Sequence, residues 1–173
     1  MPRMKKTTLS RSRSALAGLV AALAALVFLS QPARAATWKG LEPFVSKRAD
    51  VERVLGTPTS DRFDENGTLE FKVTGGAVTV FFVTQKFIAA KRLNPALEGT
   101  VLQIVLQHTN ASDTPESMNL VKNDSYEHRR DKGVDVYSDP RSGIFYTFVE
   151  SHLKTTRYSY SMEQLVNIQR GKS

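Results

Sequence analysis

The stretch that decides the fold is Thr68-Leu-Glu-Phe-Lys-Val73, followed by Thr74-Gly-Gly76 and Ala77-Val-Thr-Val-Phe-Phe-Val-Thr84. Both apolar halves are rich in β-branched and aromatic residues, which favour strands. The two glycines between them are typical of the tight turn of a hairpin. The second half is apolar on both faces, which predicts a central strand covered on both sides. The stretch therefore predicts the middle of an antiparallel sheet.

Segments with a similar composition follow later in the chain and predict further strands. They are Thr100–His108, Val134–Tyr137, Ile144–Glu150 and Lys154–Tyr160. The second and third of these flank the Pro- and Gly-containing turn at residues 139–143. Together the segments predict an α+β fold, in which a short N-terminal helix packs on a mainly antiparallel β-sheet of about five to six strands.

The N-terminal helix is predicted over Lys47–Leu55, with Ser46 as its N-cap and Gly56 at its C-terminal end. Val51, Val54 and Leu55 have the spacing of one apolar stripe. Because so short a helix is marginal alone, the stripe is expected to pack on the sheet.

Two long connections and a closing helix complete the predicted domain. The connections are Gln85–Gly99 and Thr109–Arg130, and loops of this length are usually functional or flexible. The closing helix is predicted over Met162–Ile168.

Residues 1–35 have the layout of a secretory signal peptide. A basic start precedes the apolar run Ala15–Leu29, and small residues at Ala33 and Ala35 fit a cleavage site. An uncleaved anchor is the alternative, but 15 residues reach only about 22 Å of a hydrocarbon core of about 30 Å. We therefore predict a signal peptide at 1–35, a single domain at 36–173, and a periplasmic or secreted protein.

The net charge of +7 belongs almost entirely to this leader. It comes from 24 Lys and Arg against 17 Asp and Glu, and residues 1–35 contain six of the cations and no acid. Subtracting the six leaves 18 cations against 17 acids in the body. This near-neutral balance argues against a nucleic-acid partner. The chain has no cysteine, which excludes disulfides, thiol catalysis and a lipid-bearing cysteine.

Residues 38–58 contain the most characteristic pattern, Leu41-x-Pro43-x-x-Ser46-x-x-Asp50-Val-Glu52-x-x-Leu55-Gly56-x-Pro58. It resembles the opening helix of the small-protein-A/outer-membrane-lipoprotein-A (BamE-like, SmpA/OmlA) modules and of the β-lactamase-inhibitor-like fold. It is still more similar to bacterial exported proteins of unknown function, which also have a Pro-x-x-x-Gly-Thr-Val step, here at residues 95–101. Their closing hairpin corresponds here to residues 137–146.

The resemblance implies a helix packed on an antiparallel sheet and a role in protein contacts, and it supplies no catalytic residues. Because it has no cysteine, the chain departs from the lipoprotein members, which are tethered by lipid.

No pattern predicts catalysis, a metal or a cofactor. His108, His128 and His152 lie 20 and 24 residues apart, without the spacing that aims two imidazoles at one ion. Ser142 is explained by its turn, and no Gly-x-Ser-x-Gly motif surrounds it. An acidic cluster lacks the calcium-loop spacing and reads as a solvated loop; its members are Asp61, Asp64, Glu65 and Glu70. We therefore expect a protein that is not an enzyme.

Two functions remain open. The first is a protein-interaction or envelope-associated binding module, with Arg157, Tyr158 and Tyr160 as candidate partner-binding residues on the last strand. Its partner would be an envelope or secreted protein, with no membrane anchor after cleavage. The alternative is a carrier or sensor of a small apolar ligand, held between helix and sheet by Phe81, Phe82 and Phe148.

Overall fold

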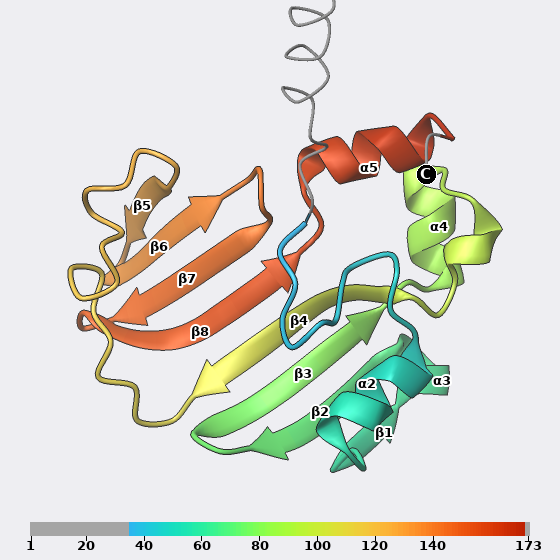
Figure 1. Cartoon of the computed structure of the whole chain (residues 1–173), viewed down its shortest axis with the longest axis horizontal. Coiled ribbons are helices and arrows are strands. Elements are labelled where there is room, and N and C mark those ends of the chain that lie inside the picture. Colours follow the sequence, from blue (N-terminus) through green and yellow to red (C-terminus); the bar gives the residue numbers. More distant parts are fainter. Residues whose placement is uncertain (1–34, 172–173) are drawn as a thin grey trace, which may run out of the picture. The chain divides into compact units, whose positions relative to one another are not determined.

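The computed structural model describes residues 35–171, which belong to one compact unit. These residues form a single antiparallel sheet of eight strands in the order β1-β2-β3-β4-β8-β7-β6-β5 (Figure 1). The strands are β1 (Ser60–Arg62), β2 (Thr68–Val73), β3 (Gly76–Phe82), β4 (Val101–His108), β5 (Glu127–Asp131), β6 (Val134–Asp139), β7 (Ile144–Val149) and β8 (His152–Ser159). The helical elements are α2 (Arg48–Leu55), α3 (Phe63–Asn66), α4 (Gln85–Lys91), the 3-10 turn η1 (Pro95–Leu97) and α5 (Met162–Gln169).

The expected α+β class with about five to six strands is wrong. The fold is mainly one large sheet of eight strands with a few short helices. The strands that were not expected, β1 and β5, lie at the two edges of the sheet. β1 has only three residues, and every residue of β5 is exposed. Neither strand therefore carries the alternation of apolar and polar residues that marks a half-buried strand in a sequence.

The two long connections also contain more structure than expected. Gln85–Gly99 contains α4 and η1, and each begins at a side-chain cap. Thr84 Oγ1 accepts a hydrogen bond from the Phe87 N–H (3.3 Å), and Asn94 Oδ1 accepts one from the Ala96 N–H (2.9 Å). The second connection ends earlier than expected because β5 already begins at Glu127. The segment between β4 and β5 is therefore residues 109–126.

The core clusters cover one face of the sheet on both of its halves. The main core cluster lies between this face and α2; its buried members are Leu41, Val51, Leu69, Phe71, Val78, Val80, Phe82, Val101 and Ile104. On the other half of the same face, residues 109–126 contribute Leu120 to a second cluster, which also contains Tyr137, Phe148 and Leu153. A third cluster joins α4 and α5 at one end of the sheet, around Phe44, Val83, Leu93 and Leu165.

Helix α2 uses its predicted stripe only in part. Val51 is fully buried and Leu55 is partly buried, whereas Val54 remains 36% exposed. Ser46 is not the N-cap, because the helix begins one residue later, after Lys47. The Asp50 carboxylate accepts a hydrogen bond from the Lys47 N–H (2.9 Å), and Ser46 Oγ accepts one from the Glu42 N–H (2.9 Å). The serine therefore stabilises the turn before the helix.

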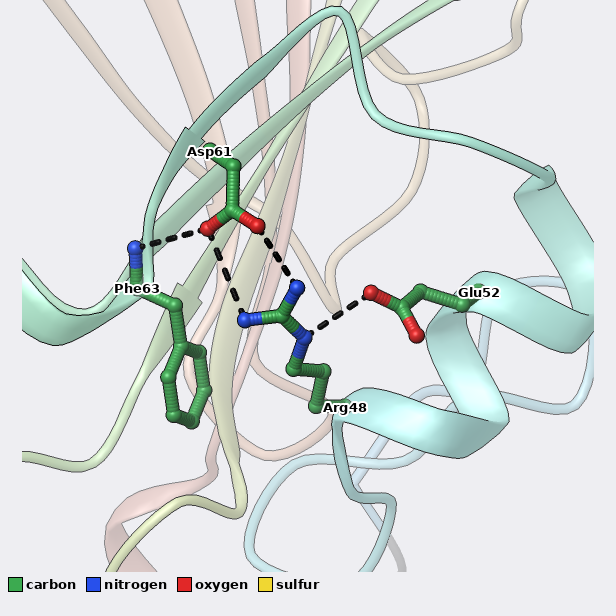
Figure 2. A network of polar contacts seen from close by, with 4 residues as sticks. All are labelled: Arg48, Glu52, Asp61 and Phe63. Carbon is green, nitrogen blue, oxygen red and sulfur yellow. Dashed lines mark hydrogen bonds and ion pairs between the residues drawn. The ribbon is translucent and has the colours of Figure 1, made fainter.

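Arg48 joins α2 to the edge of the sheet (Figure 2). Its Nε donates to Glu52 Oε1 (2.8 Å) in the same helix, and its Nη2 donates to Asp61 Oδ2 (2.6 Å) on β1. The Asp61 carboxylate also accepts the Phe63 N–H (3.1 Å), and the Arg48 guanidinium lies over the Phe63 ring at 5.1 Å. The short edge strand β1 is thus held by these side chains as well as by its backbone pairing with β2.

The predicted signal peptide lies outside the described residues, apart from Ala35. Among residues 35–171, no helix combines the length and the apolar character that a membrane span requires.

Candidate binding site

The second face of the sheet carries a row of side chains with Arg157 at its centre. The cross-strand register aligns one residue from each of seven neighbouring strands, in the order β2-β3-β4-β8-β7-β6-β5. The row consists of Glu70, Thr79, Val105, Arg157, Phe145, Ser138 and Glu127. Side chains alternate between the two faces of a strand, so this row points away from the core clusters. The expectation that β3 is covered on both sides is therefore wrong, because Thr79 and Phe81 lie on this second face.

This face is concave. Thr79 on β3 and Val136 on β6 line the same hollow, although three strands lie between them. On a flat sheet the two residues would be about 19 Å apart. The hollow has a volume of about 370 Å³, and its other lining residues are Phe81, Gln103, Val105, Gln107, Phe145, Thr147, Thr155 and Arg157.

A second hollow of about 350 Å³ continues the first toward α4 and α5. The two share Gln103, Phe145 and Arg157. The remaining residues of the second hollow are mostly apolar: Phe87, Leu102, Pro140, Gly143, Ser159, Tyr160 and Met162. We call the two hollows together the concave groove, which is more polar at the β3 end and more apolar at the helical end.

Among residues 35–171, Arg157 is the only charged residue that lines the concave groove. Its guanidinium carbon lies 3.9 Å from the centre of the Phe145 ring, in cation–π geometry. Its Nε is buried and has no hydrogen-bond partner in the part of the chain that the structure describes. Burial lowers the pKa of the Arg157 guanidinium, and Tyr160 acts in the opposite direction. Because an arginine remains protonated even then, the groove holds a positive charge without a counter-ion among the described residues.

The structure brings two of the three candidate partner-binding residues together and separates the third. Tyr160 follows the end of β8 and lines the groove beside Arg157, with its ring 5.1 Å from that of Phe44 and 6.2 Å from that of Phe87. Tyr158 faces the opposite side of the sheet and packs against the main core cluster. Tyr158 is therefore a core residue.

The contact between Phe145 and Arg157 is not predicted from the sequence. One sequence feature indicates an apolar residue on the second face of the sheet, because the strand Ile144-Phe-Tyr-Thr-Phe-Val149 has apolar residues on both of its faces. Phe81, Phe82 and Phe148, the expected lining of an apolar pocket between helix and sheet, do not come together. Phe82 and Phe148 are buried in different clusters, and Phe81 lies in the concave groove.

The histidines lie in separate surroundings. His108 Nε2 is 2.9 Å from Thr156 Oγ1, and burial lowers the pKa of this imidazole. His128 Nε2 is 2.7 Å from Asp135 Oδ1, and its ring stacks on Tyr137 at 4.4 Å. Within residues 35–171, no group of three or more metal-ligating side chains comes together.

Ser142 and the acidic residues have structural contacts. Ser142 Oγ donates to Asp139 Oδ2 (2.7 Å) within its own turn. Asp61 pairs with Arg48, and Glu70 pairs with Arg62 (2.8 Å).

Comparison of the chain with protein-family models, with the curated proteins and with the solved structures finds no match.

Proposed function

We propose that this chain is an exported, non-catalytic binding protein that receives an envelope or secreted protein in the concave groove. The observation that carries this proposal is Arg157, which lines a concave hollow of the sheet and whose buried Nε has no hydrogen-bond partner among the described residues. Phenylalanine and arginine are both enriched in protein interfaces relative to the rest of the surface. Phe145 and Arg157 supply both types in direct contact.

The two edge strands are poorly suited to bind a partner, which favours the face of the sheet as the binding surface. A partner strand could in principle extend an exposed edge. However, β1 offers only three residues, and β5 has the charged sequence Glu127-His-Arg-Arg-Asp131. Short or charged edge strands protect proteins against pairing with other chains. A partner is therefore expected to lie across the strands, in the groove.

Site-specific cross-linking tests this proposal. A photoreactive amino acid at Val136, which lines the groove, should cross-link a partner protein in the cell envelope. The matched control is Val121, which is 56% exposed but lies in the segment between β4 and β5. The captured protein, purified separately, should then bind the unlabelled chain. Equal capture from both positions, or none from Val136, would refute a partner-binding groove.

A second candidate function is the carriage of a small apolar ligand. It is supported by the size of the two hollows, which falls within the range of about 300–1,000 Å³ that is usual for ligand pockets. Native mass spectrometry separates the two functions. A small molecule that copurifies with the exported protein favours the carrier, and a bare protein favours the interaction module.

Export is part of the proposal. It rests on the basic, apolar and small-residue order of residues 1–35, and it places the protein in the periplasm or outside the cell. Mass spectrometry of the exported protein should find an N-terminus at or close to Ala36. An intact Met1 would contradict the signal peptide. The resemblance to BamE-like proteins stays a prediction, and it agrees with a role in protein contacts.

A further inference from the structure

Two arginines lie over phenylalanine rings in the described part of the chain, and they differ in their polar partners. The Arg48 guanidinium lies over Phe63, and carboxylates of Glu52 and Asp61 accept hydrogen bonds from its nitrogens (Figure 2). The Arg157 guanidinium lies closer to its ring, at 3.9 Å from the centre of Phe145. No hydrogen bond or ion pair joins Arg157 to any of the described residues. The Arg157–Phe145 pair therefore resembles the Arg48–Phe63 pair but lacks the two carboxylates.

The buried Nε of Arg157 has no hydrogen-bond partner among the described residues, which costs the free protein free energy. Partial burial removes water from a charged group, and only hydrogen bonds to an acceptor offset that loss. The aligned row across the sheet offers no nearby acceptor. Its two carboxylates, Glu70 and Glu127, each lie three strands away from Arg157, and neither lines the concave groove. The fold therefore maintains a charged group that it does not itself satisfy, which is typical of a binding site.

We propose that the concave groove binds a segment of the partner protein that presents a glutamate or aspartate carboxylate to Arg157. This inference rests on the proposed function and names the chemistry of the partner. A guanidinium binds a carboxylate through two parallel N–H···O bonds, and Phe145 fixes the plane in which those donors lie. A single guanidinium balances a single carboxylate, whereas a phosphate would leave excess negative charge in the groove.

The residues that line the groove indicate which partner side chains flank that carboxylate. Toward α4 and α5, Leu102, Tyr160 and Met162 form an apolar wall, and Met162 is 62% exposed. An apolar side chain of the partner would bury this surface. Toward β3, Thr79 and Gln107 offer hydroxyl and amide groups to the backbone of the partner. The expected segment therefore has an acidic residue next to an apolar one.

The chain's own leader does not have this chemistry. Residues 1–34 contain no aspartate or glutamate, and their charged residues are all cations. Residues 1–34 therefore cannot supply the carboxylate.

A pair of short peptides tests the inference directly. The probes are N-acetyl-Leu-Glu-Leu-amide and N-acetyl-Leu-Gln-Leu-amide, which differ only in the charge of the central side chain. The readout is the Nε–H signal of Arg157 in the NMR spectrum of the 15N-arginine-labelled protein. The glutamate peptide should shift this signal with saturation and bind about 10- to 100-fold more tightly than the glutamine peptide. Equal shifts by both peptides, or no shift by either at millimolar concentration, would overturn the carboxylate assignment.

Variants separate a binding role from a structural one. Arg157→Met should abolish the preference for glutamate and leave the melting temperature unchanged or higher, because it removes an unpaired charge. Arg157→Lys should keep a charge but lose most of the preference, since it lacks the planar pair of donors. Arg129→Gln is the control, because Arg129 lies opposite Val136 on the same face but outside the groove. A lower melting temperature for Arg157→Met would indicate a structural arginine and contradict the inference.

The cross-link at Val136 distinguishes this inference from the proposed function. Capture of a partner by Val136 that persists in Arg157→Met retains the interaction module and refutes the carboxylate. Loss of the cross-link in Arg157→Met supports both the interaction module and the carboxylate assignment. Saturable binding of decanoate in place of the glutamate peptide would refute a peptide segment and favour the carrier.

Discussion

Arg130 and Asp135 form a two-point ion pair across the hairpin of β5 and β6. Arg130 Nε is 2.7 Å from Asp135 Oδ1, and Arg130 Nη2 is 2.7 Å from Oδ2. His128 Nε2 also lies 2.7 Å from Oδ1. Arg130 and His128 both belong to the exposed edge strand β5, whereas the Asp135 side chain is buried on β6. The carboxylate therefore attaches a strand that has no buried residues of its own.

The variant Asp135→Asn should detach β5. The asparagine keeps the shape of the side chain but loses the charge that both Arg130 and His128 contact. We expect faster hydrogen exchange for the amides of Glu127–Asp131, with the protection of β3 and β4 unchanged. Asp131→Asn at the exposed end of β5 is the control and should leave exchange unaltered. Uniform loss of protection throughout the sheet would contradict this local role.

The same carboxylate predicts acid sensitivity. The hydrogen bonds from Arg130 and then His128 lower the pKa of Asp135 from its ordinary 3.8 to about 2. A lowered pKa means that the ionised group stabilises the fold above its ordinary pKa, and that this contribution disappears as the pH falls through about 2. Denaturation measured from pH 5 downward should therefore show a loss of stability that Asp135→Asn reduces. An identical acid profile for the variant would contradict the assignment.

Substitutions on α2 should distinguish its buried residue from its exposed one. Val51→Ala removes two buried methyl groups and leaves a cavity, which should lower the free energy of unfolding by about 1.5–3 kcal/mol. Val54→Ala, on the exposed side, should change it by less than about 0.5 kcal/mol. Urea denaturation measures both. Similar costs at the two positions would mean that the helix is not packed as described.

Two turn glycines with the same backbone preference should differ in their tolerance of alanine. Gly133 (φ 80°) and Gly143 (φ 75°) both adopt the left-handed conformation. A Cβ at Gly133 meets open space, so Gly133→Ala should cost about 1–2 kcal/mol from the backbone alone. A Cβ at Gly143 would lie 2.2 Å from the Ser159 carbonyl oxygen, which adds about 1–3 kcal/mol for Gly143→Ala. Thermal denaturation that ranks the two variants equally would refute this contact.

The buried tyrosines predict a loss of stability in alkali. Burial raises the pKa of both Tyr146 and Tyr158 above the ordinary 10.0. A raised pKa means that the protonated phenols stabilise the fold below pH 10.0, and that this contribution is lost as the pH rises through the higher folded values. Spectrophotometric titration of the folded protein should therefore show late phenolate formation, with one fewer late group in Tyr146→Phe. Simultaneous ionisation of all five tyrosines would contradict the burial.

The centre of the sheet could be predicted from the sequence, whereas its edges could not. The hairpin of β2 and β3 has β-branched residues on both sides of a Gly-Gly turn, so its local signals agree. β5 has no apolar residue, and it becomes a strand only because Asp135 and the ladder of β6 hold it. Its stability comes from tertiary contacts that no local pattern records.

The candidate site could be predicted only in part, for a similar reason. The alternation along β8 places Arg157 opposite Tyr158, but its contact with Phe145 depends on the register between β7 and β8. That register is fixed by a turn at Glu150 and Ser151, both with positive φ, and by an irregularity next to Thr147. A turn without glycine or asparagine gives little signal in a sequence. The neighbours of Arg157 were therefore visible only in the structure.

The N-terminal end of the described domain fixes an order of events for the proposed export. The Ala36 N–H donates to the Ser142 carbonyl (2.7 Å) in the turn between β6 and β7, and Ala35 is almost completely buried. A signal peptidase requires this stretch extended and accessible. Cleavage after Ala35 must therefore come before β6 and β7 close over it. A chain exported with this signal peptide would conceal its own processing site if it folded too early, so the proposed export requires that folding follow translocation and cleavage.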